Sequence, residues 1–335
     1  MNYRNDQTIP IKGYASFHPL KHCMVGSGFE AEWFKEFFSD KKILDPLKRI
    51  AEETEEDFLQ LSNLLIKLGV KIYRPKLDVE KYTSLSKIYR PPMTPRDHFG
   101  VIGSKFYAVQ FAQGYSNILQ KIKKDQLFLK PKDTVYTGTI DTASILRAGK
   151  DLYWGHNPIY GDPIEYVNMF EQEGFRVHLL ERNYHSDAVI SLIKPRVAVS
   201  VKNVENYKKT MPGWEVLLID DNPVLPFMPD FKSVIKGRWW IQGEENNELL
   251  SKFIDKWLGE WVGYVAESVF DVNMLSIDEN TVIVNNYNKS VFDFFKKHKV
   301  EPIIFNFRHR YFWDGGIHCL TQDLYREGEM EDYLT

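Results

Sequence analysis

The sequence repeats one pattern of secondary structure three times, and this repetition limits the possible folds more than any other feature. Residues 146–181, 193–220 and 277–307 each contain a charged turn, a short β-rich strand, a polar turn, an amphipathic helix and a second strand. Apolar residues at helical spacing predict the helices, and Val/Ile/Phe runs predict the strands. Because one such unit cannot bury its apolar face alone, the units are expected to pack around a common axis.

Two further stretches bring the predicted number of units to about five. One has its first strand in "HPLKHCMVGSG" and a helix from about Asp45 to "LLIKLGV", with an acidic run, "AEETEEDF", that we expect to be a solvated helix face. The other, "FGVIGSKFYAVQFAQGYSNILQKIKKDQLFL", is less regular. We therefore predict a single α/β domain over residues 1–335, with insertions near 28–55 and 223–261.

Composition excludes several classes of protein. The 43 Lys and Arg against 46 Asp and Glu give a net charge of −3, without the basic excess that binding to nucleic acid requires. No apolar run approaches the roughly 18 residues of a membrane span, and the N-terminal residues resemble neither a signal peptide nor a transit peptide. We expect a cytoplasmic protein with no nucleic-acid or membrane partner. With only two cysteines and no Cys-x-x-Cys pair, we expect neither disulfides nor a metal site.

The strongest local candidate for chemistry is Cys319 in "WDGGIHCLTQDL", where Gly315 and Gly316 precede a thiol on a predicted short strand. Glycines allow a ligand or another backbone segment to approach closely. The alternative is a buried structural cysteine, the usual state of a lone thiol. A nucleophile also needs a histidine and a carboxylate elsewhere in the chain. Cys23 lies in the first predicted strand, and we assign it no role.

Candidate partners for the thiol lie in three other segments. "NYHSDAVISL" places His185 and Asp187 two residues apart in a strand-like segment, so that both face one side, although a surface loop is the alternative. Asp141 in "GTIDTASIL" is either a functional acid or the N-cap of a helix. Asp97 in "PPMTPRDHF" is either a functional acid or an ordinary turn aspartate.

Taken together, these motifs resemble those of a known family. "GGIHCLT" is similar to the nucleophile motif of amidinotransferases, agmatine deiminases and dimethylarginine hydrolases, and "HSDA" is similar to their H-x-D-A motif. "DTASILRAGKDLY" resembles D-A-A-D-x-x-R-A-G-x-D, "PRD" resembles an upstream acidic position, and "SFHPLKHCMVGSG" resembles the opening strand. The chain thus resembles the arginine:glycine amidinotransferases of the guanidino-group-modifying (pentein) superfamily. This resemblance implies a five-bladed, pseudosymmetric α/β-propeller.

The resemblance also implies roles for five residues. Cys319 would be the nucleophile, His185 the acid–base group held by Asp141, and Asp97 and Asp187 the pair that binds a guanidinium. The implied reaction moves the amidino group of L-arginine through an amidino-cysteine to glycine or another amine and releases ornithine. No cofactor is implied. The expected partners are these small molecules, and a homodimer remains open.

Two departures from the family pattern concern the acceptor end of the site. Val204 stands where the family has an arginine, with Lys202 the nearby cation, and only Ser268 represents a pair of serines. The acceptor therefore need not be glycine. A hydrolase that uses water as acceptor is the main alternative, and a non-enzymatic propeller that only binds a partner is a second. The stretch after the cysteine, "QDLYREGEMEDYL", resembles the amidinotransferase C-terminus and favours transfer.

Overall fold

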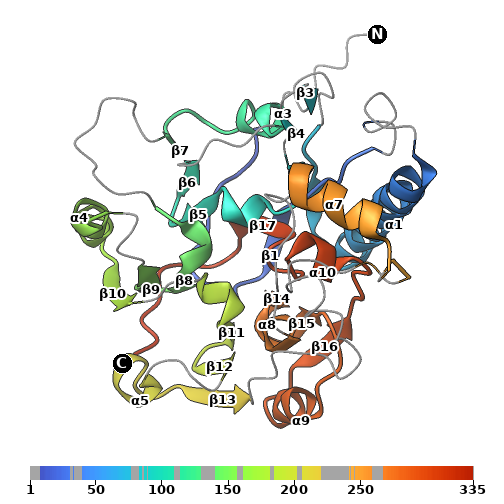
Figure 1. The fold of residues 1–335 in the computed structure, drawn as a ribbon. Helices are drawn as coiled ribbons and strands as arrows, with labels where there is room; N and C mark the ends of the chain where they lie inside the picture. The colour runs from blue at the N-terminus through green and yellow to red at the C-terminus, as the bar shows by residue number, and fades with distance from the viewer. Residues whose placement is uncertain are drawn as a thin grey trace.

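The computed structural model places five small three-stranded sheets around the middle of the molecule (Figure 1). A short two-stranded sheet, β3 (Thr83–Ser84) with β4 (Lys87–Ile88), lies apart from them. The structure describes residues 8–30, 33, 40–76, 83–84, 87–88, 90–108, 114–129, 140–156, 161–181, 185–201, 206–219, 241, 243–244, 246–258 and 267–334.

Four of the five sheets are built from consecutive strands of the chain, and the fifth combines both ends. The consecutive ones are β5 (Gly100–Ile102), β6 (Lys105–Ala108) and β7 (Leu127–Leu129); β8 (Ile145–Ala148), β9 (Asp151–His156) and β10 (Arg176–Glu181); β11 (Ile190–Lys194), β12 (Val197–Val201) and β13 (Glu215–Ile219); and β14 (Leu275–Asp278), β15 (Thr281–Val284) and β16 (Glu301–Ile304). The fifth is β17 (Thr321–Arg326), β1 (Leu20–Val25) and β2 (Lys71–Tyr73).

All five sheets share one strand pattern. The first strand runs antiparallel to the second, and the second runs parallel to the third. A parallel pair needs a crossover connection, and a helix lies in each of these connections. These helices are α1 (Lys41–Lys67), α3 (Ser116–Leu119), α4 (Ile164–Gln172), α5 (Tyr207–Thr210) and α9 (Lys289–Lys297).

The predicted strand–helix–strand repeat is therefore confirmed, but each unit has one strand more than the sequence pattern revealed. The additional strand is the antiparallel first strand of the sheet, namely β8, β11 or β14 in the three clearest repeats. In the N-terminal unit that strand is β17, which comes from the other end of the chain and pairs with β1. No local pattern near β1 could have predicted a partner about 300 residues away.

Contacts between sheets follow their order around the middle of the molecule. β17 lies against β5, and Arg147 of β8 donates a hydrogen bond to the carbonyl of Val101 in β5 at 2.8 Å. The Ser186 hydroxyl, just before β11, donates to the carbonyl of Ser144, just before β8, at 2.7 Å. β14 contacts both β11 and β1. The start of every first strand is thereby directed toward one central region.

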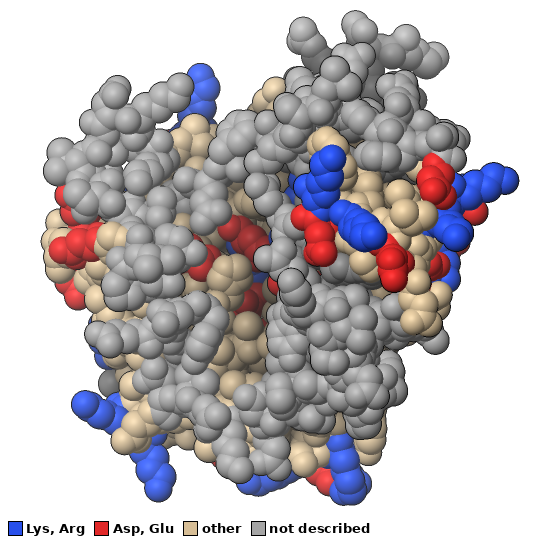
Figure 2. Space-filling view, in the orientation of Figure 1, with Lys and Arg blue, Asp and Glu red and all other residues tan. Residues whose placement is uncertain are grey.

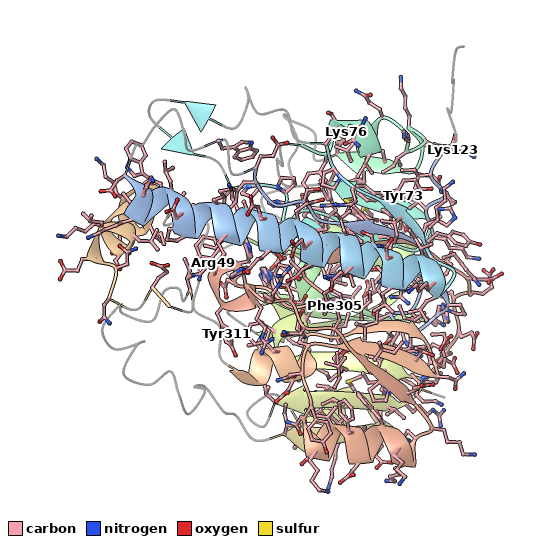
Figure 3. All side chains as sticks on the ribbon, turned by 90° about the vertical axis from the view of Figure 1, so that its right-hand side faces the viewer. Arg49, Tyr73, Lys76, Lys123, Phe305 and Tyr311 are labelled. Carbon is pink, nitrogen blue, oxygen red and sulfur yellow. The ribbon has the colours of Figure 1, made fainter. Side chains whose placement is uncertain are left out.

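Helix α1 crosses the outside of the sheet formed by β17, β1 and β2 (Figure 3). It also anchors the segment that leads into the Cys319 motif. Asp57 accepts hydrogen bonds at 2.8 Å from the backbone N–H and from Nε of Arg308. The Thr54 hydroxyl accepts one from Trp313 Nε1 at 2.9 Å, at the end of α10 (Arg310–Trp313). The acidic run 51–58 is thus only partly solvated: Thr54 and Asp57 are buried, because they bind this segment.

Both predicted insertions lie only partly within the described residues. Helix α1 begins at Lys41, capped by Asp40, inside the predicted insertion at 28–55. Of the predicted insertion at 223–261, the structure describes mainly α7 (Glu248–Trp257), which packs against α1. In the described ranges, no helix has both the length and the apolar character needed to cross a lipid bilayer.

A buried cluster of four charged residues connects three of the sheets. Asp323 in β17 is 1 % exposed and accepts hydrogen bonds from Arg96 Nη2 at 2.8 Å, from Arg326 Nε at 2.9 Å and from Arg147 Nη2. The second nitrogen of each arginine binds backbone: Arg96 Nε donates to His318 O at 2.9 Å, and Arg326 Nη1 donates to His18 O at 2.6 Å. The three guanidinium groups hold the pKa of Asp323 well below its usual range, against the opposing effect of burial.

Replacing Asp323 is expected to destabilise the fold strongly. Asp323→Asn should lower the free energy of unfolding by about 3–5 kcal/mol, because it leaves three buried guanidinium groups without their counter-charge. Urea unfolding at pH 7 measures this. Asp293→Asn, which removes an exposed partner of Lys289 on α9, is the matched control and should change stability by less than about 0.5 kcal/mol. Equal effects of the two variants would show that the cluster does not organise the fold.

Candidate active site

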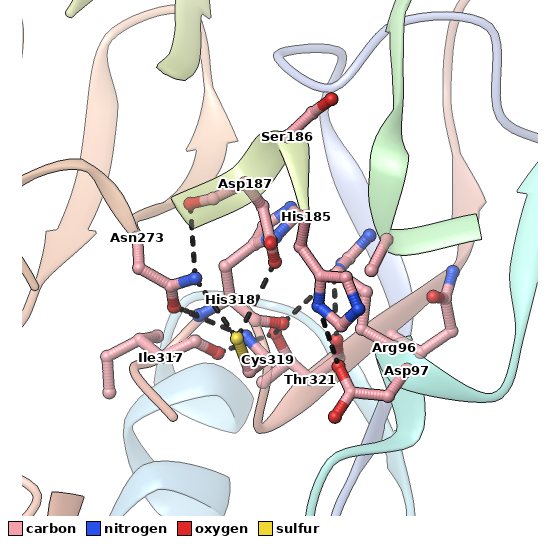
Figure 4. A network of polar contacts seen from close by, with 12 residues as sticks. Arg96, Asp97, His185, Ser186, Asp187, Asn273, Ile317, His318, Cys319 and Thr321 are labelled. Atoms are coloured by element: carbon pink, nitrogen blue, oxygen red, sulfur yellow. Dashed lines mark hydrogen bonds and ion pairs between the residues drawn. The ribbon is translucent and has the colours of Figure 1, made fainter. Parts of the chain in front are cut away.

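Cys319 lies in a turn between α10 and β17, at the centre of the close-up in Figure 4. The expectation that it lies on a strand is wrong, since β17 begins only at Thr321. Gly316 is required at this turn, because a Cβ there would lie 2.6 Å from Oδ1 of Asn273. The Gly-Gly pair thus permits close approach of a neighbouring side chain to the cysteine turn, as the sequence analysis expected of glycines.

Two buried asparagines from the fourth sheet hold this turn. Asn273, just before β14, accepts hydrogen bonds at Oδ1 from the backbone N–H groups of His318 at 2.9 Å and Cys319 at 3.3 Å. Its Nδ2 donates to Cys319 Sγ at 3.1 Å and to the carbonyl of Asp187 at 3.2 Å. Asn285 accepts from the Ile317 N–H at 2.9 Å and donates to the carbonyl of Asn273 at 2.6 Å.

His185 lies beside two of the predicted carboxylates. Its Nε2 is 3.3 Å from Asp141 Oδ2, and its Nδ1 is 3.7 Å from Asp97 Oδ1. Asp141 also caps the short 3₁₀ helix η3 (Thr142–Ser144), accepting from the Ala143 N–H at 3.1 Å. The two alternatives for Asp141, N-cap and partner of a histidine, are therefore both present in the structure.

Asp187 lies on the other side of the site, next to the thiol. Its Oδ2 accepts a hydrogen bond from His318 Nδ1 at 2.8 Å and lies 3.6 Å from Cys319 Sγ. The prediction that His185 and Asp187 share one face of a strand is wrong. Asp187 lies in the 3₁₀ helix η5 (Ser186–Ala188), with His185 as its N-cap residue, and the two side chains meet different partners: Asp187 contacts His318 and Cys319, and His185 lies beside Asp97 (Figure 4).

In each of the five units, a residue two to four positions before the first strand contributes one of these groups. Asp97 ends the 3₁₀ helix η2 (Pro95–Asp97) before β5, Asp141 precedes β8, and Asp187 precedes β11. Asn273 precedes β14, and Cys319 precedes β17. The five side chains converge because the first strand of every sheet begins near the middle of the molecule. Acidic side chains are visible in a hollow near the centre of this face (Figure 2).

The electrostatics of the site oppose a free thiolate and favour a protonated imidazole. Burial, together with the negative charges of Asp187 and Asp97, raises the pKa of Cys319 well above the usual value of a thiol. Burial lowers the pKa of His185, but Asp97, Asp141 and Asp187 outweigh burial, and its pKa is raised. Burial and Arg96 lower the pKa of His318 to about 4, so that it is neutral at pH 7.

Two carboxylate oxygens at the site are buried without a hydrogen-bond partner among the described residues: Oδ1 of Asp97 and Oδ1 of Asp187. Burying an unpaired carboxylate oxygen is unfavourable unless a ligand supplies the donor. The pair is therefore suited to a cationic ligand with several N–H groups. In the described part of the chain, no cluster of side chains is suited to hold a metal ion.

The remaining sequence candidates fall into two groups. Cys23 is fully buried, and burial raises its pKa to about 12, in agreement with its having no assigned role. Lys202 and Val204 lie outside the described residues, and the side chain of Ser268 is also outside them. The sequence analysis missed Asn273, Asn285 and Arg96. The juxtaposition of Arg96 with Asp97 in "PRD" was a local signal, and Asn273 begins "NMLSID", which matches an N-x-L-x-x-D motif of the resembling family, but nothing local distinguished Asn285.

Two curated proteins with similar sequences are amidinotransferases. The chain is 23 % identical over 207 residues to an L-arginine:L-lysine amidinotransferase from Pseudomonas savastanoi pv. phaseolicola, covering 60 % of this chain and 48 % of that protein. It is 25 % identical over 212 residues to a mitochondrial glycine amidinotransferase from Xenopus tropicalis, covering 60 % and 42 %. The aligned region thus spans less than half the length of these relatives. A scan against protein-family models finds no match.

Solved structures extend the similarity to nearly the whole chain. An amidinotransferase of the saxitoxin biosynthetic pathway from Microseira wollei superimposes with a TM-score of 0.70 at 17 % identity, covering 97 % of this chain and 99 % of that one. A dimethylarginine dimethylaminohydrolase from Pseudomonas aeruginosa superimposes with a TM-score of 0.55 at 12 % identity, covering 91 % and 99 %. The resemblance seen in the motifs is confirmed: the chain has the pentein fold, and it is similar in sequence and structure to amidinotransferases.

Proposed function

We propose that this protein is an amidinotransferase that takes the amidino group of L-arginine onto Cys319 and passes it to an amine. The observation that carries the proposal is a buried site in which the Asp187 carboxylate lies 3.6 Å from the Cys319 thiol and Asp97 lies beside His185, while Oδ1 of each carboxylate has no hydrogen-bond partner among the described residues. A guanidinium is planar, always charged and rich in N–H donors, so it matches two carboxylates in the same site as a nucleophile. The sequence relatives, whose names describe amidino transfer, support the same assignment.

Binding of the guanidinium would also prepare the thiol. The two carboxylates that raise the pKa of Cys319 would be neutralised by the substrate, and a cation beside Sγ favours the thiolate. The thiol proton then leaves to water, and the thiolate attacks the central carbon of the guanidinium. Nucleophile and substrate charge are therefore coupled, because a bound cation increases the fraction of Cys319 that is thiolate.

His185 would supply and remove the remaining protons. As an imidazolium held by Asp141 and Asp97, it donates a proton to the departing nitrogen of arginine. The C–N bond breaks, ornithine leaves and an amidino-cysteine remains. A neutral amine then attacks the same carbon, His185 accepts the proton from the attacking nitrogen, and the C–S bond breaks to regenerate Cys319.

The acceptor is proposed as a primary amine, and glycine is one candidate among several. The names of two relatives include lysine and glycine, which shows that related proteins differ at this point. Water as acceptor would give a hydrolase, the activity named for one protein of the same fold. A non-enzymatic binding protein would not need a thiol beside a carboxylate whose Oδ1 has no hydrogen-bond partner among the described residues. The cytoplasmic location and the homodimer stay predictions.

Incubation with L-arginine tests the function directly. We expect release of ornithine and a covalent adduct of about 42 Da on Cys319, followed by transfer to one or more amines of a panel that includes glycine, lysine and ornithine. Mass spectrometry of the peptide and of the products measures both steps. Cys319→Ala should abolish both, whereas Cys23→Ala is the matched control. An adduct on Cys23, or citrulline formation without any amine, would contradict the proposal.

Replacing the proposed acid–base group should affect the chemical steps more than substrate binding. His185→Asn is expected to lower kcat by about 10²–10⁴-fold and to leave KM for arginine within a few-fold. Steady-state kinetics at saturating acceptor measure this. His22→Asn serves as control, because His22 in β1 is hydrogen-bonded to Tyr73 in β2, away from the site. A near-normal kcat in His185→Asn would move the proton-transfer role to another residue.

The raised pKa of His185 is expected to depend on its carboxylate neighbours. Asp141→Asn keeps the N-cap acceptor but removes one negative charge, so the pKa of His185 should fall. A raised histidine pKa stabilises the fold below the unfolded value of about 6.5, and this contribution is lost as pH rises through the folded value. NMR titration of the imidazole measures the shift. Asp97→Asn should act in the same direction, whereas no change in either variant would contradict the pairing.

A further inference from the structure

We propose that Asn273 is a catalytic residue whose side-chain amide donates a hydrogen bond to the Cys319 thiolate and thereby stabilises the nucleophile. The inference rests on the proposed role of Cys319 and extends it to a residue to which the sequence analysis assigned no role. Asn273 Nδ2 lies 3.1 Å from Sγ, which is closer than the nearest carboxylate oxygen, Asp187 Oδ2, at 3.6 Å. Asn273 is 1 % exposed, so water does not compete for this contact.

The orientation of the amide is determined by its surroundings. The backbone N–H groups of His318 and Cys319 both point at one atom of the Asn273 side chain, at 2.9 and 3.3 Å. Two donors can be satisfied only by the carbonyl oxygen, so that atom is Oδ1. The other atom must be the NH₂ group, and its two hydrogens are directed to Cys319 Sγ and to the carbonyl of Asp187.

A neutral donor has a specific value at this position. The charged groups that face the thiol are the carboxylates of Asp187 and Asp97, and both oppose ionisation of the sulfur. His318 and Arg96 stabilise the Asp187 carboxylate and so keep that negative charge in place. A donor aimed at Sγ stabilises the thiolate without adding a positive charge that would repel the guanidinium substrate.

The symmetry of the fold supports the same assignment. Each of the five units places one polar side chain at the residues just before its first strand, and four of these, Asp97, Asp141, Asp187 and Cys319, have roles in the proposed reaction. Asn273 occupies the corresponding position in the unit that begins with β14. Asn285 holds it there by donating to its backbone carbonyl at 2.6 Å. The unit that begins with β14 therefore also contributes a group that touches a reacting atom, the sulfur of Cys319.

Two substitutions separate the donor role from a purely structural one. Asn273→Asp preserves the acceptor for the two backbone N–H groups but turns a carboxylate toward Sγ. Asn273→Ala removes both functions. A purely structural role predicts that folded molecules of the alanine variant are alkylated at the wild-type rate, whereas the aspartate variant is slowed under either role because its carboxylate opposes ionisation of the sulfur. The donor role predicts that both variants are impaired, with the aspartate variant at least as strongly affected as alanine.

The measurement is the rate at which iodoacetamide alkylates Cys319 in the whole protein at pH 8. Mass spectrometry of the intact protein counts the alkylated thiols in each molecule, and mass spectrometry of its peptides locates them. Each unit of increase in thiol pKa lowers the thiolate fraction tenfold but raises its nucleophilicity about threefold, so we expect alkylation to slow by about threefold or more. In parallel, kcat/KM for arginine should fall about ten- to a hundredfold. The rate is counted only in molecules in which the buried Cys23 is unmodified, which excludes unfolded protein.

An alanine variant alkylated at the wild-type rate, or an aspartate variant that matches the wild type, would overturn the proposal. The alkylation rates do not require turnover. If the wild type forms no adduct with arginine, the proposed function fails, and the order of the three alkylation rates still decides whether Asn273 stabilises the thiolate.

Discussion

The buried contact of Asp323 with three arginines connects the parts of the structure on which the site depends. One carboxylate, 1 % exposed, neutralises guanidinium groups from three separate segments, and each guanidinium also binds a backbone carbonyl. Arg96 directly precedes Asp97 and donates to the carbonyls of His318 and Thr321 on either side of Cys319. The ion cluster that joins the sheets therefore also holds Asp97, a proposed substrate-binding carboxylate, in position relative to Cys319, the proposed nucleophile.

Around this cluster, the repeated unit explains why a site forms at all. Each sheet begins with a strand whose first residues face the middle of the molecule, and the preceding turn or 3₁₀ helix contributes one polar side chain. Such short, irregular segments can expose carboxylates to a ligand, whereas a strand interior would commit its backbone to pairing. Stability comes from the sheets and helices, so the segments between them can carry unpaired charges.

The charges at the centre are arranged for a substrate and are unfavourable without one. Two carboxylate oxygens lack donors among the described residues, and the thiol is held protonated by its neighbours. Binding a cation would relieve both conditions at once, which links specificity for a guanidinium to activation of the nucleophile. The neutral amide of Asn273 fits this arrangement, because it favours the thiolate without cancelling the attraction for the cation.

Local sequence was enough to predict the repeated strand–helix–strand units, because periodicity is carried by neighbouring residues. Short motifs were enough to select five candidate site residues: Cys319, His185, Asp97, Asp141 and Asp187. Only tertiary structure decided the rest. It paired β17 with β1, and it placed Cys319 in a turn and Asp187 in a 3₁₀ helix rather than on strands. It also buried part of the acidic face of α1 against Arg308 and Trp313. It also brought Asn273 to the thiol across 46 residues of chain. Contacts between distant segments leave no periodic trace in either one, since each asparagine or aspartate acquires its role only from the partner that folding brings to it.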